Sequence, residues 1–440
     1  MKKGNATLVF LALIVFTALA WMGTVKGQMD INTAYNDHIK KAESFEEKEI
    51  YVDALDNYKK ALEINPKEYN LVLKVADMYY KLGDINGFIA TCDKAINMKP
   101  DDPSPYIIVI NHYMSKSQYT EAIKVVNDAS AVIKNNEQIN NLKLELSTKY
   151  YEKYVSYTEI CDWHIQNGVN YVAALENEKW GMVLKDGSKS LQFGFEYLGA
   201  YDAESGVIPC CKEGIYYYID LNGNKKLIGD NLYQYLGSFG NGLAPAQRDG
   251  KYGYIDKEFN EKSFEFEYAG SFANNVATVK KDGKWALINT KLEAITKFEY
   301  DEILVDSYGF CSVYNVIVAR KGEKYQLIDH SGKTIGEEKF DGAALPAASD
   351  SYIAVKKGDK WGFADKSGAI VIKPQYEDAK SFSMGLAPVK IEDRWGYINT
   401  SGELVIETKY FDAGVFSSDG SAAVKNSYAW NFIVLCEYNN

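Results

Sequence analysis

The sequence predicts a multidomain chain with three parts. An N-terminal membrane helix comes first, an α-helical repeat domain follows, and an all-β repeat domain comes last. Three observations lead to this fold class. Residues 6–25 carry no charge, residues 28–154 place apolar positions three and four residues apart, and residues 155–440 repeat an aromatic phrase about every 35 residues. Of the 440 residues, 46% are apolar and 25% charged, which excludes wholesale disorder and a polytopic membrane protein.

Residues 1–27 are predicted to be a signal anchor or a signal peptide. Two lysines precede the uncharged run 6–25, which at about 20 residues is long enough to span a bilayer. A cleaved signal would use residues 18–20 as its small-residue site, whereas an uncleaved anchor would place Trp21 at the far interface. We expect a single N-terminal span in the cell membrane with the bulk of the chain extracytoplasmic. Secretion after cleavage is the alternative.

Residues 28–154 are predicted to form a helical repeat, because similar residues recur 34 positions apart. These sets are Ala54, Phe88 and Ala122; Ala61, Ala95 and Ala129; and Pro66 with Pro100. The segment resembles the tetratricopeptide repeat (TPR) family, in which small alanines let paired helices pack closely. That resemblance implies an α-solenoid with a concave groove that usually holds a protein or peptide, and a mere spacer is the alternative. Residues 137–154 are expected to form a capping helix.

Residues 155–440 repeat a phrase in which a basic residue precedes an aromatic residue, often Trp-Gly, at the start of a short strand. The aromatic positions are Trp180, Tyr216, Tyr252, Trp285, Tyr325, Trp361, Trp395 and Tyr428. Turns that begin with Asp or Asn and contain Gly separate the strands. From about residue 170 onward the chain resembles the WG-repeat (KWG) family of bacterial proteins. The resemblance implies a repeat architecture and carries no firmly implied enzymatic activity.

Eight units of short strands must hide their sheet edges, and closure into a ring does so. We therefore predict a β-propeller-like domain of about 7–8 short blades, with an open β solenoid of hairpins as the alternative. Residues 157–160 echo residues 300–303, while the last repeat stops near its second strand. The first fragment is therefore expected to complete the last blade.

No catalytic, cofactor-binding or metal-ligating set is evident, so we predict that the chain is not an enzyme. The nearest candidates are the repeat-motif positions Trp180, Gly181, Tyr252, Gly253, Trp285, Trp361, Gly362, Trp395 and Gly396. Periodic aromatics are usually core, so we expect these to be structural; aromatic platforms for sugar rings are the alternative. The copy beginning at Lys284 is the longest, and its insertion at 304–315 is where an enzymatic site would be sought, although no catalytic set is evident there.

The predicted function is a non-enzymatic extracytoplasmic protein-interaction scaffold. A cell-envelope module that binds wall glycan on the β face is the alternative. The formal net charge of −11 argues against nucleic acid as a partner, because phosphate neutralisation requires a basic surface. The expected partners are a protein or peptide in the helical groove and the membrane through residues 6–25.

Overall fold

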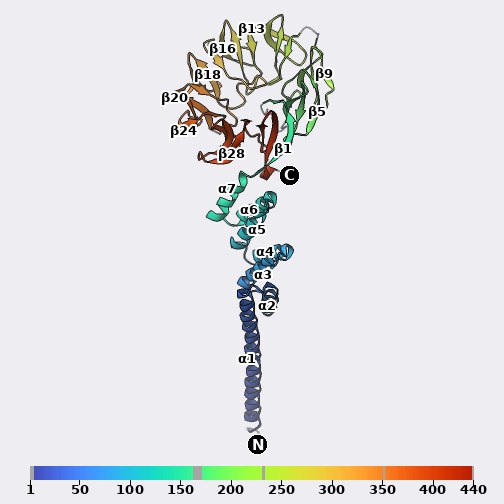
Figure 1. Ribbon diagram of the computed structural model, residues 1–440, viewed down its shortest axis with the longest axis vertical. Helices are drawn as coiled ribbons and strands as arrows, with labels where there is room; N and C mark the ends of the chain where they lie inside the picture. The colour runs from blue at the N-terminus through green and yellow to red at the C-terminus, as the bar shows by residue number, and fades with distance from the viewer. Residues whose placement is uncertain (1–3, 162–170, 230–232, 350–351, 439–440) are drawn as a thin grey trace. The chain divides into compact units, whose positions relative to one another are not determined.

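The computed structural model describes residues 4–161, 171–229, 233–349 and 352–438, and the chain divides into two compact units (Figure 1). The helical unit is Met1–Ser147 and the β unit is Thr148–Asn440. The sequence predicts this boundary after residue 154, at the end of the expected capping helix. In the structure the last helix ends at Ser147 and a strand begins at Tyr150, so residues 148–154 lie in the β unit.

Within the described residues, the helical unit holds seven α-helices joined by short turns. They are α1 (Gly4–Glu47), α2 (Tyr51–Ile64), α3 (Tyr69–Lys81), α4 (Ile85–Met98), α5 (Ser104–Ser115), α6 (Tyr119–Val132) and α7 (Glu137–Ser147). Helices α1 and α2, α3 and α4, and α5 and α6 pack as three successive pairs, and α7 follows against α6. This arrangement of helix pairs is the one that the sequence predicted.

The positions that recur every 34 residues form the core of the helical unit. Each is at most 2% exposed: Ala54, Ala61, Phe88, Ala95, Ala122 and Ala129. Alanine leaves room for the neighbouring helix, so the pairs pack closely along α2, α4 and α6. Pro66 and Pro100 lie in the turns after α2 and α4, where their missing N–H breaks no helical hydrogen bond.

In the described part of the chain, no helix combines the length and the apolarity that crossing a bilayer requires. Most side chains of the predicted span 6–25 lie outside the described residues. The membrane segment therefore stays a prediction.

The described residues of the β unit form eight small antiparallel sheets, which we call blades and number along the chain. Blade 1 consists of β2 (Glu159–Ile160), β3 (Val172–Glu176), β4 (Lys179–Val183) and β5 (Lys189–Phe195). Blade 2 consists of β6 (Tyr197–Leu198), β7 (Ile208–Lys212), β8 (Ile215–Ile219) and β9 (Lys225–Leu227). Blade 3 consists of β10 (Tyr235–Leu236), β11 (Ala244–Arg248), β12 (Lys251–Ile255) and β13 (Glu261–Phe266). Blade 4 consists of β14 (Tyr268–Ala269), β15 (Val276–Lys281) and β16 (Lys284–Asn289).

The remaining blades repeat this plan. Blade 5 consists of β17 (Glu302–Ile303), β18 (Ile317–Lys321), β19 (Lys324–Ile328) and β20 (Thr334–Phe340). Blade 6 consists of β21 (Gly342–Ala343), β22 (Ile353–Lys357), β23 (Lys360–Ala364) and β24 (Ile370–Tyr376). Blade 7 consists of β25 (Asp378–Ala379), β26 (Leu386–Ile391), β27 (Arg394–Asn399) and β28 (Leu404–Tyr410). Blade 8 consists of β29 (Asp412–Ala413), β30 (Ser421–Asn426), β31 (Ala429–Leu435) and, from the start of the β unit, β1 (Tyr150–Tyr157). A short 3₁₀ helix, Cys436–Tyr438, follows β31.

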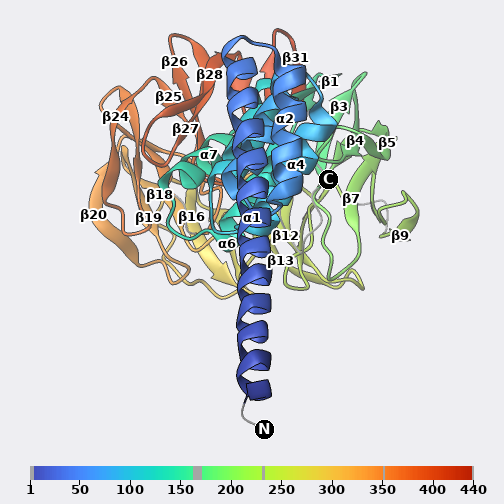
Figure 2. The ribbon, with the colours of Figure 1, turned by 90° about the horizontal axis from the view of Figure 1, so that it is seen from below.

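The blades stand around a ring, with outer strands such as β5, β20 and β24 at its rim (Figure 2). The first and last parts of the β unit meet, because β1 pairs with β31. Tyr157 stands opposite Trp430 there, as Tyr410 stands opposite Trp395 in blade 7. The first fragment thus completes the last blade, as the sequence predicted.

Among the residues that the structure describes, eight apolar clusters lie between neighbouring blades, and they include one between the last blade and the first. In that last cluster Tyr157 and Val172 meet Phe432. The described residues therefore form a closed, propeller-like arrangement of eight blades and not an open solenoid.

Local turn chemistry explains why the sequence folds into such short strands. The Oδ1 atom of Asp365 accepts the backbone N–H groups of Ser367 and Ala369, at 2.8 and 3.1 Å. Gly368 completes that turn with a φ of +82°, a conformation that side chains with a Cβ rarely adopt. The expected Asp-or-Asn turns with Gly are thus confirmed at the hairpins between third and fourth strands.

Candidate functional sites in the propeller and in the helical unit

The repeated aromatic residues lie on the third strand of each blade and differ in burial. Trp180, Tyr252, Trp285 and Trp361 are half-buried, and Trp395 is only 6% exposed. A lysine ammonium lies 5.9 Å from the ring centroid of Trp285, and another lies 5.2 Å from that of Trp395. Each of these lysines is thus a cation–π partner of the ring within the protein. We therefore interpret the aromatic positions as packing positions.

The glycine after the aromatic residue lets the fourth strand of the blade pass close by. A Cβ on Gly362 or Gly396 would lie 2.5 Å from a carbonyl oxygen of that strand. On Gly181 and Gly253 the corresponding distances would be 2.9 and 2.8 Å. All four are well inside the roughly 3.5 Å of a normal non-bonded contact, so these positions require glycine. Other blades do not need it: blades 2, 5 and 8 have Tyr217, Gln326 and Asn431 at this position and still carry a fourth strand.

The eighth repeat position is Trp430 and not Tyr428. Trp430 pairs with Lys425 on the neighbouring strand, as Trp395 pairs with Lys390 in blade 7. Tyr428 lies in the turn between β30 and β31 and is 93% exposed. Two aromatic residues stand two positions apart here, and only the strand register distinguishes them.

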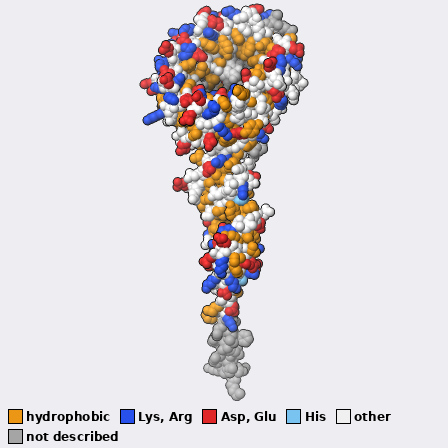
Figure 3. Space-filling view, in the orientation of Figure 1, with side chains coloured by type: hydrophobic (Ala, Val, Ile, Leu, Met, Phe, Trp, Pro, Cys, Tyr) orange, Lys and Arg blue, Asp and Glu red, His pale blue; other side chains and the backbone are white. Residues whose placement is uncertain are grey.

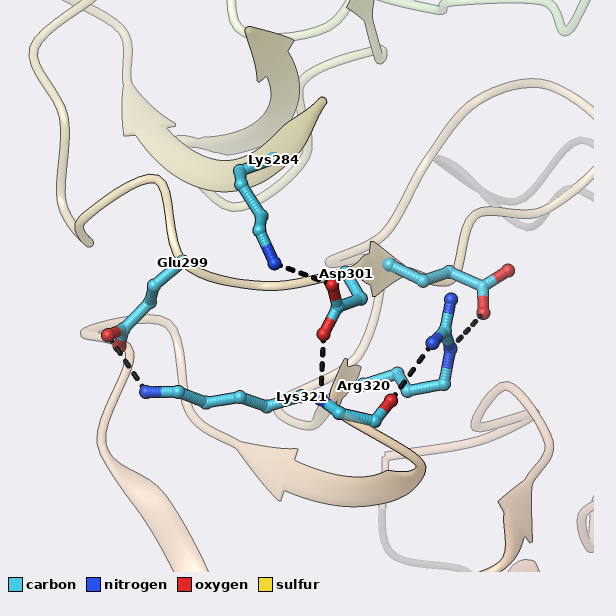
Figure 4. A network of polar contacts seen from close by, with 7 residues as sticks. Lys284, Glu299, Asp301, Arg320 and Lys321 are labelled. Atoms are coloured by element: carbon cyan, nitrogen blue, oxygen red, sulfur yellow. Dashed lines mark hydrogen bonds and ion pairs between the residues drawn. The ribbon is translucent and has the colours of Figure 1, made fainter. Parts of the chain in front are cut away.

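Acidic residues bridge neighbouring blades through hydrogen bonds and ion pairs, as the network around Asp301 shows (Figure 4). The Asp301 carboxylate accepts a hydrogen bond from the Lys284 ammonium of blade 4 at 2.6 Å and from the Gly322 N–H of blade 5 at 2.6 Å. Both bonds lower the pKa of Asp301, and Lys284 is the larger cause. Glu196 makes the same two contacts between blades 1 and 2, at 3.3 and 2.9 Å. Such solvent-facing pairs contribute only about 0–1 kcal/mol each to the free energy of folding. These bridges therefore fix the orientation of neighbouring blades more than they stabilise the fold.

A cavity of about 230 Å³ lies inside the ring of blades. Its wall is built from segments that follow the short first strands of blades 5 to 8, and it includes Asp306, Phe310, Tyr314, Lys380, Ser381 and Phe416. In Figure 3, hydrophobic side chains gather toward the middle of this unit and charged side chains toward its rim. The insertion 304–315, which the length of its repeat marked as the place to look for a site, supplies a large share of the wall.

Asp306 opens the insertion with a turn that the fold also uses at its outer hairpins. Its Oδ1 atom accepts the backbone N–H groups of Tyr308 and Phe310, both at 2.9 Å. Asn289 and Asn399 hold turns of the same form with a neutral amide. The turn therefore needs an oxygen acceptor at position 306 but does not need a negative charge.

The insertion is fixed both to blade 1 and to its neighbour, blade 4. The backbone N–H of Ala173, in blade 1, donates to the Tyr308 hydroxyl at 3.2 Å. The Ser312 hydroxyl contacts the carbonyl oxygens of Ala273 and Val276 in blade 4, both at 2.8 Å. These contacts hold the cavity wall in one geometry, which is what a binding site requires.

Titration behaviour limits the chemistry of the cavity. Burial raises the pKa of Tyr314 to about 12, and the charge of Asp306 adds to that shift. Burial likewise raises the pKa of the Cys311 thiol to about 12. Both groups are neutral at pH 7, so Tyr314 can donate a hydrogen bond, whereas Cys311 supplies no thiolate nucleophile. Across the described ranges, no three His, Cys, Asp or Glu side chains are grouped closely enough to hold a metal ion.

A second hollow, of about 350 Å³, lies on the helical unit between α4, α5 and α6. Tyr106 and Val109 of α5 are buried in its wall, and Val132 of α6 is 50% exposed. Asp93 and Asp128 also line the hollow, and both are exposed. Neither carboxylate forms an ion pair with a residue that the structure describes. Sequence reasoning missed both, because two aspartates among 60 acidic residues carry no signal of their own.

Solved structures of TPR domains are similar to the helical region. The "TPR2B-domain:pHsp70-complex of yeast Sti1" is 19% identical and covers 26% of this chain and 94% of that chain, with a TM-score of 0.22. The "Arabidopsis OM64 TPR domain" is 16% identical over 26% of this chain and 93% of that chain, also with a TM-score of 0.22. The "First TPR of Spaghetti (RPAP3) bound to HSP90 peptide SRMEEVD" is 18% identical over 26% and 90%, again at 0.22. No curated protein matches the chain in sequence.

The sequence profile of the "WG containing repeat" family matches four stretches of the β unit, residues 232–252, 252–285, 361–395 and 395–430. Those stretches end at Tyr252, Trp285, Trp395 and Trp430, which are the repeat positions that the strand register assigns. The C-terminal part of the chain therefore carries WG-containing repeats, as its resemblance to that family led us to expect.

Proposed function

We propose that this chain is a non-enzymatic scaffold that binds a segment of a partner protein through its helical unit. Both units are built from repeats, and such architectures present surfaces more often than they assemble catalytic groups. The observation that carries the proposal is the hollow between α4, α5 and α6, because it is partly apolar and carries two carboxylates.

The composition of this hollow defines the partner segment that fits it. The apolar wall around Tyr106 and Val109 accommodates one large apolar side chain, whose burial is worth about 1.5–3 kcal/mol. Asp93 and Asp128 attract Lys or Arg on either side of that residue and repel an acidic segment. The preferred partner therefore presents an apolar residue flanked by basic ones.

Selection from a peptide library tests this preference with the full chain as bait. We expect enriched peptides to carry a Leu, Ile, Phe or Met flanked by Lys or Arg. The double variant Asp93→Lys with Asp128→Lys is expected to weaken the selected peptides about tenfold or more, since two attractive pairs become repulsive.

The matched control is Asp37→Lys with Glu63→Lys, which changes the net charge equally at exposed positions outside the hollow. This control should keep the affinity. Enrichment of acidic peptides, or equal loss in both double variants, contradicts the proposed site.

We further propose that the scaffold is extracytoplasmic and held in the membrane by residues 6–25. The proposal is supported by the uncharged run of about 20 residues behind Lys2 and Lys3, which has the length and flanking charge of a signal anchor. Protease added to intact cells that express the chain is expected to degrade the β unit. Its complete resistance, with a cytoplasmic marker equally resistant and a surface marker cleaved, contradicts an external location.

A further inference from the structure

His112 of α5 lies inside the helical unit without a hydrogen-bond partner for one of its ring nitrogens. Of the histidines that the structure describes, only this one is buried, and its side chain is 5% exposed. Its Nδ1 atom is enclosed and makes no hydrogen bond. Buried polar atoms without a partner are rare in folded proteins, so this nitrogen requires an explanation.

Aromatic rings surround the His112 side chain. The ring centroids of Tyr80 of α3, Phe88 of α4 and Tyr113 of α5 lie 5.6, 5.5 and 5.6 Å from the centroid of His112. Among these neighbours only the two phenols can titrate, and neither accepts a hydrogen bond from Nδ1. A neutral imidazole packs well in such surroundings, whereas an imidazolium would bury an N–H donor without an acceptor.

The charged groups of the helices around His112 do not stabilise a protonated ring. On α5 itself, Lys116 is a second cation and opposes the charge. On α4, the carboxylate of Asp84 accepts a backbone N–H of the first turn at 2.9 Å. On α3, the Lys81 ammonium that follows Tyr80 is a cation and lies 2.9 Å from the Asp77 carboxylate. No carboxylate is therefore directed at His112.

Protonation of His112 is unfavourable in the folded unit as a result. Its place in the last turn of α5 favours a cation through the helix dipole, but burial acts in the opposite direction. Burial prevails, and with the Lys116 charge it lowers the pKa of His112 from the usual 6.5. The unfolded chain thus takes up this proton at a higher pH than the folded one. The packing around His112 is most stable above about pH 6.5 and loses stability as the pH falls below it.

Phe88 connects His112 to the hollow between α4, α5 and α6. The Phe88 ring contacts His112 and belongs to the same apolar cluster as Val109 and Val125, which line the hollow. Val109 also precedes His112 by three residues on α5, so the two lie on the same face of that helix. A shift of α5 against α3 and α4 therefore moves the wall of the hollow.

We propose that His112 is a pH-sensitive element, whose protonation loosens the packing of α5 on α3 and α4 and thereby weakens binding of the partner segment in the hollow. This inference rests on the proposed function, because the hollow is the site that it regulates. Proton uptake and segment binding then oppose each other, and by linkage each weakens the other to the same extent.

The affinity of the full chain for a peptide is measured at pH 7.5 and pH 5.5, which lie about one unit on either side of the ordinary pKa of histidine. The probe is the tightest peptide from the library selection above that contains neither His nor an acidic residue, with both ends blocked. We expect it to bind about fivefold or more weakly at pH 5.5. The variant His112→Phe keeps an aromatic ring among its neighbours but takes up no proton. It should bind comparably at pH 7.5 and show no loss at pH 5.5.

The matched control is His38→Gln, which removes a half-buried histidine of the same unit whose Nδ1 atom lies 3.0 Å from the Asn57 side-chain oxygen. This control should keep the pH dependence. If His112→Phe does not fold, His112→Gln replaces it as a second variant that does not titrate. A loss of affinity that persists in the His112 variants comes from other groups and overturns the inference.

Hydrogen exchange of the α5 amides in the full chain without peptide gives a readout that does not depend on the hollow. After correction for intrinsic exchange rates, protection of α5 should decrease at pH 5.5 in the unmodified chain and stay constant in the His112 variants. Unchanged protection in the unmodified chain overturns the role of His112. Failure of every selected peptide to bind at pH 7.5 contradicts the proposed function instead, whereas equal binding at both pH values overturns only this inference.

Discussion

Replacing Trp395 by alanine is expected to lower the free energy of unfolding of the β unit by about 3–5 kcal/mol, the usual cost of emptying a buried aromatic site. Trp395 is 6% exposed, stands opposite Tyr410 across the β27–β28 pair and belongs to the apolar cluster between blades 7 and 8. The indole therefore joins two blades as well as two strands. Chemical denaturation of the β unit, followed by tryptophan fluorescence or circular dichroism, measures the loss.

Tyr428→Ala is the matched control for this substitution. Spacing alone places Tyr428 in the last repeat position, but it is 93% exposed in a hairpin turn. Its removal should therefore change the free energy of unfolding by no more than about 0.5 kcal/mol. A Trp395→Ala protein as stable as the unmodified chain would show that the repeated Trp is not a packing residue and would restore the platform hypothesis.

Proline at Tyr151 is expected to open the ring at its closing sheet and to cost about 2 kcal/mol or more. The Cys436 N–H donates to the Lys149 carbonyl at 2.8 Å. Since hydrogen-bonded pairs alternate along an antiparallel ladder, Tyr151 opposite Val434 is the next such pair. Proline there removes the donor and leaves a carbonyl of β31 unpaired. Limited proteolysis and thermal unfolding of the full chain report the opening.

The control is proline at Tyr150, one residue earlier in the same strand. By the same alternation, the N–H of Tyr150 points away from β31, so this proline removes no ladder hydrogen bond. Tyr150 also packs against the apolar cluster between blades 7 and 8, so each proline variant is compared with alanine at the same position, which isolates the ladder bond. Equal destabilisation by the two prolines would mean that pairing of β1 with β31 does not close the ring.

Repetition explains why most of the architecture could be predicted. A single Ala or Trp-Gly dipeptide carries little information, but the 34-residue spacing of Ala61, Ala95 and Ala129 reports a core position, and each proves fully buried. The glycine at Gly362 or Gly396 recurs because a backbone must pass where a Cβ would stand. Such requirements are local to one unit, so they can be read from the sequence.

The candidate sites could not be predicted in the same way, because they depend on residues that do not repeat. The cavity brings Asp306 together with Lys380 and Phe416, which come from different blades and share no spacing rule. The length of the copy that begins at Lys284 indicated the insertion, but only the ring shows which side chains converge there. Asp93 and Asp128 line one hollow because α4 and α6 both pack against α5, and their exposed positions resemble any other solvated helix face.

The pairing of β1 with β31 has a consequence for how the protein is made. The last blade takes its outer strand from residues 150–157 and its inner strands from residues 412–435, so its two parts leave the ribosome nearly a whole domain apart. Until the later part emerges, Tyr157 and Val172 have no Phe432 to cover them, and the nascent chain carries an open apolar edge. A chain that lacks residues 412–435 would therefore keep seven blades' worth of sequence and still expose an apolar edge, the kind of surface through which incompletely folded chains aggregate.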